Sequence, residues 1–408
     1  MTGTVDFDQA LETVLQHASA LAGTSTETLP LLHCRERVLA TSIRADRDQP
    51  PFDRATRDGF AVRASDEAGA LHLIGSVRAG EQWQGPTLTS GQAIEIMTGA
   101  PMPPGSDAVL MVEHAEQQAD TIRPIDGRKL HPRENVVPRG SEARACQSLL
   151  TPGTLLEAAE IALASSCGYS SLTVFRKPKV AIIATGDELV ELDTAPELHQ
   201  IRNSNSYSLA ALAASAGAEP IRLGIAADQR ASLLVKIAAA RTSNLLLLSG
   251  GVSMGKYDLV EEVLLSLGAE FFFTGIRMQP GKPLVFGRLP ATERFPALYF
   301  FGLPGNPIST QVTFHCFAAP LLRALAGSPA RSPRFAQATL SEAVEGKPGI
   351  MRVLPAHLTS SRSLPQVRLV PWHGSGDLAA NARANCYAVL PPGKSHFAPG
   401  EVITILLR

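Results

Sequence analysis

The region from Lys179 to about Leu325 alternates apolar strands with helices, and this alternation limits the fold more than any other feature of the chain. It is typical of a mostly parallel sheet with helices on both faces. The expected strands are Val180–Ala184, Ile221–Ile225, Leu245–Leu248, Phe271–Phe273, Leu284–Phe286 and Leu298–Phe301, and the expected helices are Ser206–Ala216, Gln229–Ala240, Leu259–Leu267 and one that starts near Pro307. We therefore expect a central α/β domain.

Three glycine-containing loops follow strands of this domain, at Thr185–Glu188, Ser249–Gly255 and Leu303–Pro307. Parallel sheets bind ligands at the carboxyl ends of their strands, and glycines let backbone N–H groups approach an anion closely. A glycine after a single strand is usually only part of a turn, but three such loops in one sheet predict a site for a phosphate-bearing small molecule. The candidate binding residues are Thr185, Gly186, Ser249, Gly250, Gly251, Ser253, Pro304, Gly305 and Asn306.

Acidic side chains stand beside two of these loops. Asp187 and Glu188 belong to the first loop, and Asp258 follows the second. Carboxylates next to a phosphate would repel it unless a cation lay between them, and Mg²⁺ accepts carboxylate and phosphate oxygens together. The acids therefore favour a Mg²⁺ site, with the alternative that Glu188 caps a helix or faces solvent.

Two further segments carry candidate residues. Lys282 lies between Pro280 and Pro283 on a stiff segment, which suits the binding of an oxyanion, although a turn with a solvated lysine is the alternative. Asp58 precedes a glycine and a short expected strand, and an ordinary Asp-Gly turn is the alternative there. Neither segment assigns a function by itself.

Different sequence textures flank the central domain. Helical spacing at Asp6–Leu21 and Leu155–Cys167 encloses a region of short β-rich runs, and short strands return after Pro333. We expect the two helical stretches to pack together. The expected domains are a helical domain (residues 1–48 and 139–177), an inserted β domain (49–138), the central α/β domain (178–328) and a C-terminal β domain (329–408).

Composition argues against several classes of protein. The net charge of −1 is unfavourable for a nucleic-acid-binding protein with a broad basic face. The five cysteines include no CxxC pair, so neither a zinc site of the usual spacing nor a disulfide framework is expected. No apolar stretch approaches the roughly 18 residues of a membrane span, and the N-terminus lacks the pattern of a signal peptide. We therefore expect a soluble cytoplasmic protein.

Specific motifs occur in order along almost the whole chain. They are DGFAV at Asp58–Val62, IMTGAPMPPGSDAVLMVE at Ile96–Glu113, ATGDELVE at Ala184–Glu191, NSNSYSL at Asn203–Leu209, LSGGVSMGKYDLV at Leu248–Val260, PGKP at Pro280–Pro283, GLPGNPIS at Gly302–Ser309 and HGSGDLAANARAN at His373–Asn385. Together they resemble the MoeA family of molybdopterin molybdenumtransferases, which includes the gephyrin E domain and the plant Cnx E domain.

The resemblance implies a fold and a reaction. The fold is a central three-layer α/β sandwich like that of MogA, with a helical dimerisation domain, an inserted β domain and a C-terminal β domain. The reaction inserts molybdenum from molybdate into adenylylated molybdopterin and releases AMP with the help of Mg²⁺. The implied assembly is a homodimer in which the β domain carrying Asp58 reaches across to the partner subunit. The implied partners are the adenylyltransferase and the molybdoenzymes that receive the cofactor.

Matching positions assign roles within this resemblance. The implied catalytic residues are Asp58, Thr98, Glu142, Glu188 and Asp258. Asp187 and Glu188 would hold the cation. The implied molybdate-binding residues are Lys282, Ser309, Arg352 and Ser375.

Some positions depart from the pattern of the family. Arg57 stands where methionine is common, and its charge could pair with Asp58 or alter the pKa of that carboxyl. Glu142 replaces an aspartate, Gln279 replaces a lysine, and Asn203 replaces an aspartate. We interpret these changes as tuning of the site.

Two other functions are compatible with parts of the sequence. A molybdopterin adenylyltransferase shares the central α/β fold but lacks the flanking β domains that this chain is expected to have. A non-catalytic scaffold or cofactor sensor would keep the cleft without needing its acids. Retention of Asp58, Glu188, Asp258 and Lys282 favours an enzyme.

Overall fold

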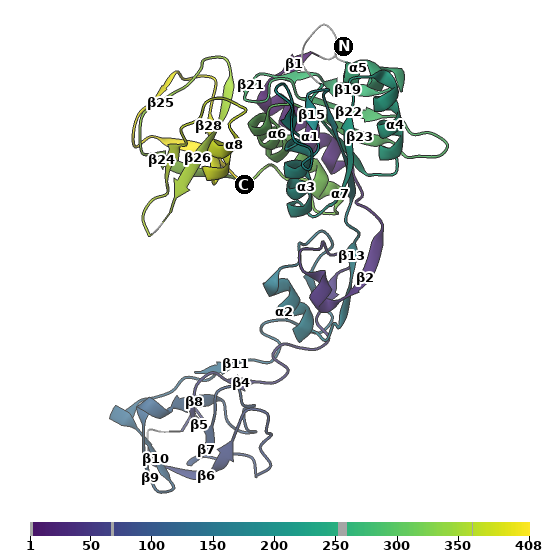
Figure 1. Ribbon diagram of the computed structural model, residues 1–408. Coiled ribbons are helices and arrows are strands. Elements are labelled where there is room, and N and C mark those ends of the chain that lie inside the picture. Colours follow the sequence, from purple (N-terminus) through teal and green to yellow (C-terminus); the bar gives the residue numbers. More distant parts are fainter. Residues whose placement is uncertain (1–2, 67–68, 252–258, 361) are drawn as a thin grey trace. The chain divides into compact units, whose positions relative to one another are not determined.

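The computed structural model describes residues 3–66, 69–251, 259–360 and 362–408. The chain divides into two compact units (Figure 1). The first comprises Met1–Ala40, Pro152–Glu157 and Leu172–Arg408, and the second comprises Thr41–Thr151 and Ala158–Ser171. The first unit therefore contains both the central α/β domain and the C-terminal β domain.

The central domain is built on a sheet with strand order β17-β14-β18-β23-β22-β19. Its strands are β14 (Lys179–Thr185), β17 (Glu219–Ala226), β18 (Leu245–Ser249), β19 (Glu270–Phe273), β22 (Val285–Leu289) and β23 (Leu298–Leu303). The first four strands in this order run parallel, and β22 runs antiparallel to both of its neighbours. The predicted, mostly parallel sheet is confirmed.

Both faces of this sheet are buried, which explains its continuous apolar strands. Successive side chains of a strand point to opposite faces. In β18, Leu245 and Leu247 pack into one hydrophobic cluster, whereas Leu246 and Leu248 pack into another. A run of leucines without polar alternation is what a parallel strand covered on both faces requires.

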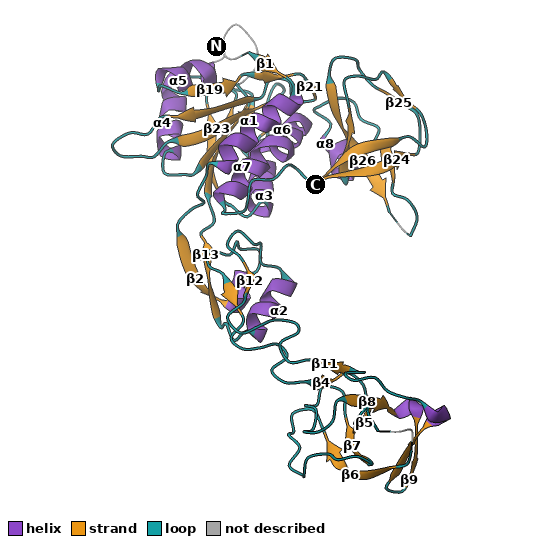
Figure 2. Ribbon diagram, turned by 180° about the vertical axis from the view of Figure 1, so that it is seen from behind, coloured by secondary structure: helices purple, strands orange, loops and turns teal. Residues whose placement is uncertain are grey.

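Helices cover the two faces of the sheet and complete the predicted three-layer sandwich (Figure 2). One cluster contains apolar residues of α1 (Phe7–Ser19), α3 (Asn205–Ser215), α6 (Pro307–Thr313) and α7 (Ala319–Leu325). The other contains residues of α4 (Arg230–Ala240) and α5 (Leu259–Ser266). A π-helical turn, Phe314–Ala318, joins α6 to α7.

The N-terminal helix α1 belongs to the central domain, which differs from the expectation that it packs against the helical stretch near Leu155–Cys167. Its apolar stripe, which includes Phe7, Leu11 and Val14, is buried in the same cluster as residues of α7. Phe7 also makes an edge-on contact with Phe317, at a centroid distance of 5.3 Å. The stripe predicts that α1 packs on an apolar surface, but it does not identify the element that provides this surface.

The C-terminal domain contains a sheet with order β21-β26-β27-β24-β30-β28 and one further helix. The elements are β21 (Met278–Gln279), β24 (Phe335–Leu340), β26 (Met351–Thr359), β27 (Gln366–Leu369), α8 (Leu378–Arg383), β28 (Cys386–Leu390) and β30 (Val402–Leu407). The short strand β21 comes from the central region and pairs Gln279 with Arg352. This pairing attaches the segment before Lys282 to the C-terminal domain.

The second unit contains the predicted inserted β domain. Its main sheet has the order β8-β5-β7-β6-β10-β9. The strands are β5 (Gly59–Val62), β6 (Leu71–Val77), β7 (Gln92–Ile96), β8 (Ala108–Met111), β9 (Ala115–Gln118) and β10 (Thr121–Pro124), and the unit also holds β3 (Ile43–Arg44), β4 (Arg54–Ala55), β11 (Val136–Val137), β12 (Ser148–Leu150) and α2 (Ala158–Ser166). The expected region of short β-rich runs and the expected second helical stretch are thus present.

Short strands complete the architecture. They are β1 (Thr4–Val5), β2 (Thr26–Pro30), β13 (Ser171–Phe175), β15 (Leu189–Val190), β16 (Ile201–Arg202), β20 (Gly275–Ile276), β25 (Val344–Glu345) and β29 (His396–Phe397). In the part of the chain that the structure describes, no helix has the length and apolarity needed to cross a membrane.

Candidate active site

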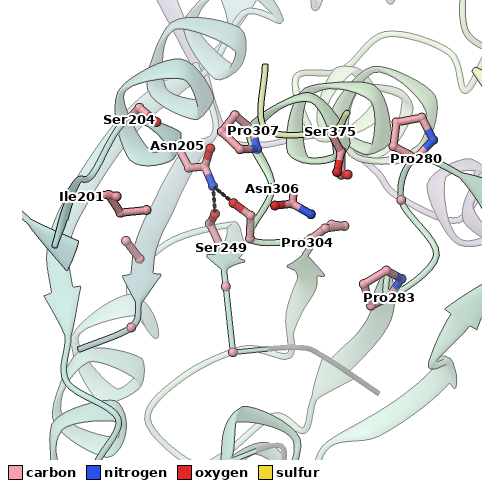
Figure 3. A pocket seen from close by; sticks show the side chains of 18 of the residues that line it. Ile201, Ser204, Asn205, Ser249, Pro280, Pro283, Pro304, Asn306, Pro307 and Ser375 are labelled. Carbon is pink, nitrogen blue, oxygen red and sulfur yellow. Dashed lines mark hydrogen bonds between the residues drawn. The ribbon is translucent and has the colours of Figure 1, made fainter. Parts of the chain in front are cut away.

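A cavity of about 1060 Å³ lies at the carboxyl ends of the parallel strands (Figure 3). The described parts of all three predicted loops line it, through Thr185–Gly186, Ser249–Gly251 and Pro304–Pro307. The register explains why the loops meet: Ala184 of β14 lies opposite Ser249 of β18, which lies opposite Leu303 of β23. The three strands therefore end level with one another, and their loops share one edge of the sheet.

Two adjacent glycines allow the second loop to approach the first. Gly250 and Gly251 have φ angles of +89° and +65°, a backbone conformation that favours glycine. A Cβ on Gly250 would lie 2.5 Å from the carbonyl oxygen of Thr185, and one on Gly251 would lie 2.6 Å from the Thr185 hydroxyl. The loop thus needs glycine both for its backbone angles and for its close contact.

Asn205, at the start of α3, ties the loops together (Figure 3). Its Nδ2 donates to Ser249 Oγ at 2.9 Å and to the carbonyl oxygen of Gly305 at 2.7 Å. Among the described residues, its Oδ1 and the hydroxyl oxygen of Thr185 are buried without a hydrogen-bond partner, although both residues line the cavity. Because buried polar atoms are normally paired, these two atoms are candidates for hydrogen bonds to a ligand in the cavity.

Among the described residues, two carboxylates line the cavity beside these loops, on Glu188 and Asp228. Asp187 does not line it; its Oδ1 accepts a hydrogen bond from the Asp228 backbone N–H at 3.0 Å. Among residues 3–66, 69–251, 259–360 and 362–408, no group of three or more His, Cys, Asp or Glu side chains is arranged to hold a metal. Two carboxylates nevertheless fit Mg²⁺, which is usually bound by one or two carboxylates, water and substrate phosphate.

Asp228 and Asn205 are site residues that the sequence interpretation missed. Asp228 follows β17, the parallel neighbour of β14, so it is also an acid at a strand end. The rule that parallel sheets bind ligands at these ends applies to it as well. Asn205 lies within the NSNSYSL stretch at the start of a predicted helix, and this position in the sequence could have identified it as a candidate site residue.

Three of the predicted oxyanion-binding residues meet in the cavity. Lys282, Ser309 and Ser375 all line it, and Ser375 comes from the C-terminal domain. Arg352 does not line the cavity. Its Nη1 donates to the carbonyl oxygen of Glu345, its Nε is buried without a partner in the described part of the chain, and burial lowers its pKa. Lys282, Ser309 and Ser375 are therefore the predicted oxyanion-binding residues that share the cavity.

None of the remaining predicted residues belongs to the described lining of the cavity. Asp58, Thr98 and Glu142 belong to the second compact unit. The Thr98 backbone N–H donates to Asp58 Oδ1 at 2.6 Å, and the backbone and side-chain hydrogen bonds of Thr98 lower the pKa of Asp58. Glu142 pairs with Arg54 at 3.2 Å. Asp258 and Ser253 lie outside the described residues.

The expected influence of Arg57 on Asp58 is not seen. The Arg57 Nη1 donates to the carbonyl oxygen of Thr56 at 3.2 Å. The lowered pKa of Asp58 instead has its causes in the hydrogen bonds from Thr98, with the backbone N–H contributing most. The hydrogen bonds that lower the pKa of the Asp58 carboxyl therefore come from Thr98 and not from Arg57.

A capped turn shapes the C-terminal part of the cavity. Asp377 Oδ1 accepts from the Ala380 backbone N–H at 2.9 Å, and Asp377 Oδ2 accepts from the His373 backbone N–H at 3.1 Å. These bonds place Ser375 between the two anchors of the turn. They also lower the pKa of Asp377, with the Ala380 N–H as the largest cause.

Acidification is expected to loosen this turn only below about pH 4. Because the pKa of Asp377 is lowered in the folded state, its bonds stabilise the fold above the unfolded pKa of about 3.9 and are lost as pH falls through the folded pKa. The fluorescence of Trp372, which lines the cavity, should report this loss in a Trp83→Phe background. The transition should disappear in Asp377→Asn, and a transition centred near neutral pH would contradict the assignment to Asp377.

Comparison with known families agrees with this arrangement. Residues 5–168 match the MoeA N-terminal region (domain I and II), residues 181–324 match a probable molybdopterin binding domain, and residues 337–407 match the MoeA C-terminal region (domain IV). The cavity is lined by residues of the second and third of these regions.

Curated proteins and a solved structure resemble the chain over nearly its full length. It is 36% identical over 393 residues to a molybdopterin molybdenumtransferase of Nostoc sp., which covers 93% of this chain and 88% of that protein. It is 33% identical to the Haemophilus influenzae protein of the same name, with 94% of each chain covered. A moeA protein from Pyrococcus horikoshii OT3 has a TM-score of 0.80 at 26% identity, covering 99% of this chain and 100% of that one. The chain therefore belongs to the MoeA family of molybdopterin molybdenumtransferases, as its motifs predicted.

Proposed function

We propose that this protein is a molybdenum insertase, which transfers molybdenum from molybdate to adenylylated molybdopterin and releases AMP in a Mg²⁺-dependent reaction. The observation that carries the proposal is the meeting of three kinds of group in one cavity. They are the glycine-rich strand ends, the carboxylates of Glu188 and Asp228, and the polar set of Lys282, Ser309 and Ser375. Family membership supports the same reaction class.

The groups of the cavity divide into two sets with different chemistry. Backbone N–H groups at the ends of β14, β18 and β23 suit phosphate oxygens, because glycine permits their close approach. Lys282 supplies a positive charge, and Ser309 and Ser375 supply hydroxyl donors, for a tetrahedral oxyanion. The cavity thus offers neighbouring subsites for the adenylate and for molybdate.

Glu188 and Asp228 would hold Mg²⁺ next to the phosphate subsite. When bound, the ion supplies positive charge that stabilises the leaving phosphate. Asp187 orients this region by accepting the hydrogen bond from the Asp228 backbone N–H. The Thr185 hydroxyl and Asn205 Oδ1, which have no partner among the described residues, would bind and orient polar groups of the substrate.

The functional assembly that we propose is a homodimer, in which the unit carrying Asp58, Thr98 and Glu142 contributes to the partner's cleft. A lowered pKa keeps Asp58 ionised there at neutral pH. An adenylyltransferase would supply the substrate, and molybdoenzymes would accept the product. Analytical ultracentrifugation tests the assembly.

Release of AMP from adenylylated molybdopterin tests the proposed reaction. We expect release to depend on both molybdate and Mg²⁺ and to be accompanied by formation of a molybdenum-containing pterin. Consumption of ATP with accumulation of the adenylate would instead identify an adenylyltransferase. Tight binding of the adenylate without any turnover would identify a scaffold or sensor.

A further inference from the structure

A buried pair of amide side chains joins the central domain to the C-terminal domain beside the cavity. The Asn381 Nδ2 donates to the Gln311 Oε1 at 2.8 Å. Gln311 lies on α6, and Asn381 lies on α8. Their exposed fractions are only 7% and 2%, so water does not readily replace this hydrogen bond.

Two hydroxyls that line the cavity belong to α6 and to the turn before α8. Ser309 lies two residues before Gln311 on α6, and Ser375 lies in the turn that precedes α8. A second bond connects these elements, because the Ile308 backbone N–H donates to the carbonyl oxygen of Ser375 at 2.9 Å. Ile308 and Gln311 are three residues apart, so they lie on one face of α6.

The segment from Ser375 to Asn381 is thus attached to α6 at both of its ends. Arg408 holds the far side of α8, since its Nη1 donates to the carbonyl oxygens of Asn381 and Ala384 at 2.8 and 2.7 Å. The turn between the two attachments is itself stiffened by Asp377. A shift of the amide pair would therefore be transmitted to the position of Ser375.

We infer that the Gln311–Asn381 pair is a positioning device that sets the separation of Ser375 from Ser309 and thereby the affinity for the oxyanion substrate. This inference rests on the proposed molybdate subsite and goes beyond it, because neither amide lines the cavity. The amides suit this role because the hydrogen bond from Asn381 Nδ2 to Gln311 Oε1 forms in only one relative placement of α6 and α8, whereas apolar contacts tolerate sliding.

The test compares molybdate kinetics in variants of the pair. In Asn381→Leu and in Gln311→Leu we expect the KM for molybdate to rise about tenfold, because misplacement of a binding group weakens binding. The kcat at saturating molybdate should change less than about twofold. The exchange variant, Gln311→Asn with Asn381→Gln, keeps both amides and the summed side-chain length, and it should recover most of the lost affinity.

Asn385 provides a matched control within the C-terminal domain. In the described part of the chain its side chain bonds the backbone of Leu358, accepting from the N–H at 2.7 Å and donating to the carbonyl oxygen at 2.9 Å. Asn385→Ser should lower the Tm without raising the KM for molybdate. If Asn381→Leu and Gln311→Leu behave like this control, or if the exchange variant recovers nothing, the positioning role is wrong.

Hydrogen exchange separates failure of this inference from failure of the proposed function. Faster exchange of the Ile308 amide, which donates to Ser375, is expected in Asn381→Leu and not in Asn385→Ser. Unchanged exchange would overturn the positioning role even in an active insertase. Absence of molybdate-dependent AMP release in the unmodified protein would instead overturn the proposed function, whatever the exchange result.

Discussion

The substitution Glu188→Gln is expected to lower molybdate-dependent AMP release about 10²- to 10³-fold, the cost typical of removing one group that stabilises developing charge. Glu188 is one of two described carboxylates that line the cavity. Glutamine keeps the size of the side chain and removes its charge, so the site loses half of its described anionic ligand set for Mg²⁺. AMP release should be measured over a range of Mg²⁺ concentrations, and excess Mg²⁺ should restore only part of the rate.

Glu191 is the matched control for this experiment. It lies three residues further along the same segment, but its carboxylate pairs with Arg222 at 3.1 Å and accepts from the Tyr207 hydroxyl at 3.3 Å. It does not line the cavity. Glu191→Gln should therefore leave the Mg²⁺ dependence unchanged, and both variants should keep the oligomeric state of the unmodified protein. Normal turnover by Glu188→Gln would remove Glu188 from the proposed cation site.

The second large effect is expected from Gly250→Ala. An alanine at a φ of +89° costs about 1–2 kcal/mol in backbone strain. Its Cβ would also lie 2.5 Å from the carbonyl oxygen of Thr185, so the second loop must move away from the first. We expect a lower Tm and at least about a tenfold weaker binding of the adenylylated substrate, because the loop N–H groups leave their positions.

Gly217→Ala separates strain from collision. Gly217 has a φ of +86°, but a Cβ there would meet nothing within 4 Å. It follows α3 in the same domain, so its replacement should cost about 1–2 kcal/mol of strain and leave substrate binding intact. Equal losses of binding in the two variants, measured by calorimetric titration and thermal unfolding, would contradict a specific role for the close contact at Gly250.

Local patterns were sufficient to predict the central fold. The leucine run of β18 is buried on both faces of the sheet, and a strand in that position needs apolar side chains at every residue. The glycines at 250 and 251 reflect backbone angles that other residues rarely adopt. Burial on two faces and steric limits act within a few residues, so they leave a direct imprint on the sequence.

Contacts between distant segments could not be predicted in the same way. The apolar stripe of α1 predicts a buried face, but it does not specify which surface covers that face. In the structure, α1 packs with α7, whereas the expected partner was the helical stretch at Leu155–Cys167. Asp228 joins the acids of the cavity only because β17 is the parallel neighbour of β14. Strand order depends on the whole chain, and no local spacing reports it.

The three glycine-containing loops, their acids and the lysine of the PGKP segment were determined by the sequence alone, because each depends on residue type and local backbone geometry. Only the tertiary structure decided how they are combined. In the folded protein, Ser375 lines the same cavity as Lys282 and Ser309. Asn205 forms hydrogen bonds with Ser249 and Gly305 of two loops. Arg352 donates to the carbonyl oxygen of Glu345. The physical reason is that hydrogen bonds between side chains far apart in the sequence form only after the sheet register and the domain packing have placed them.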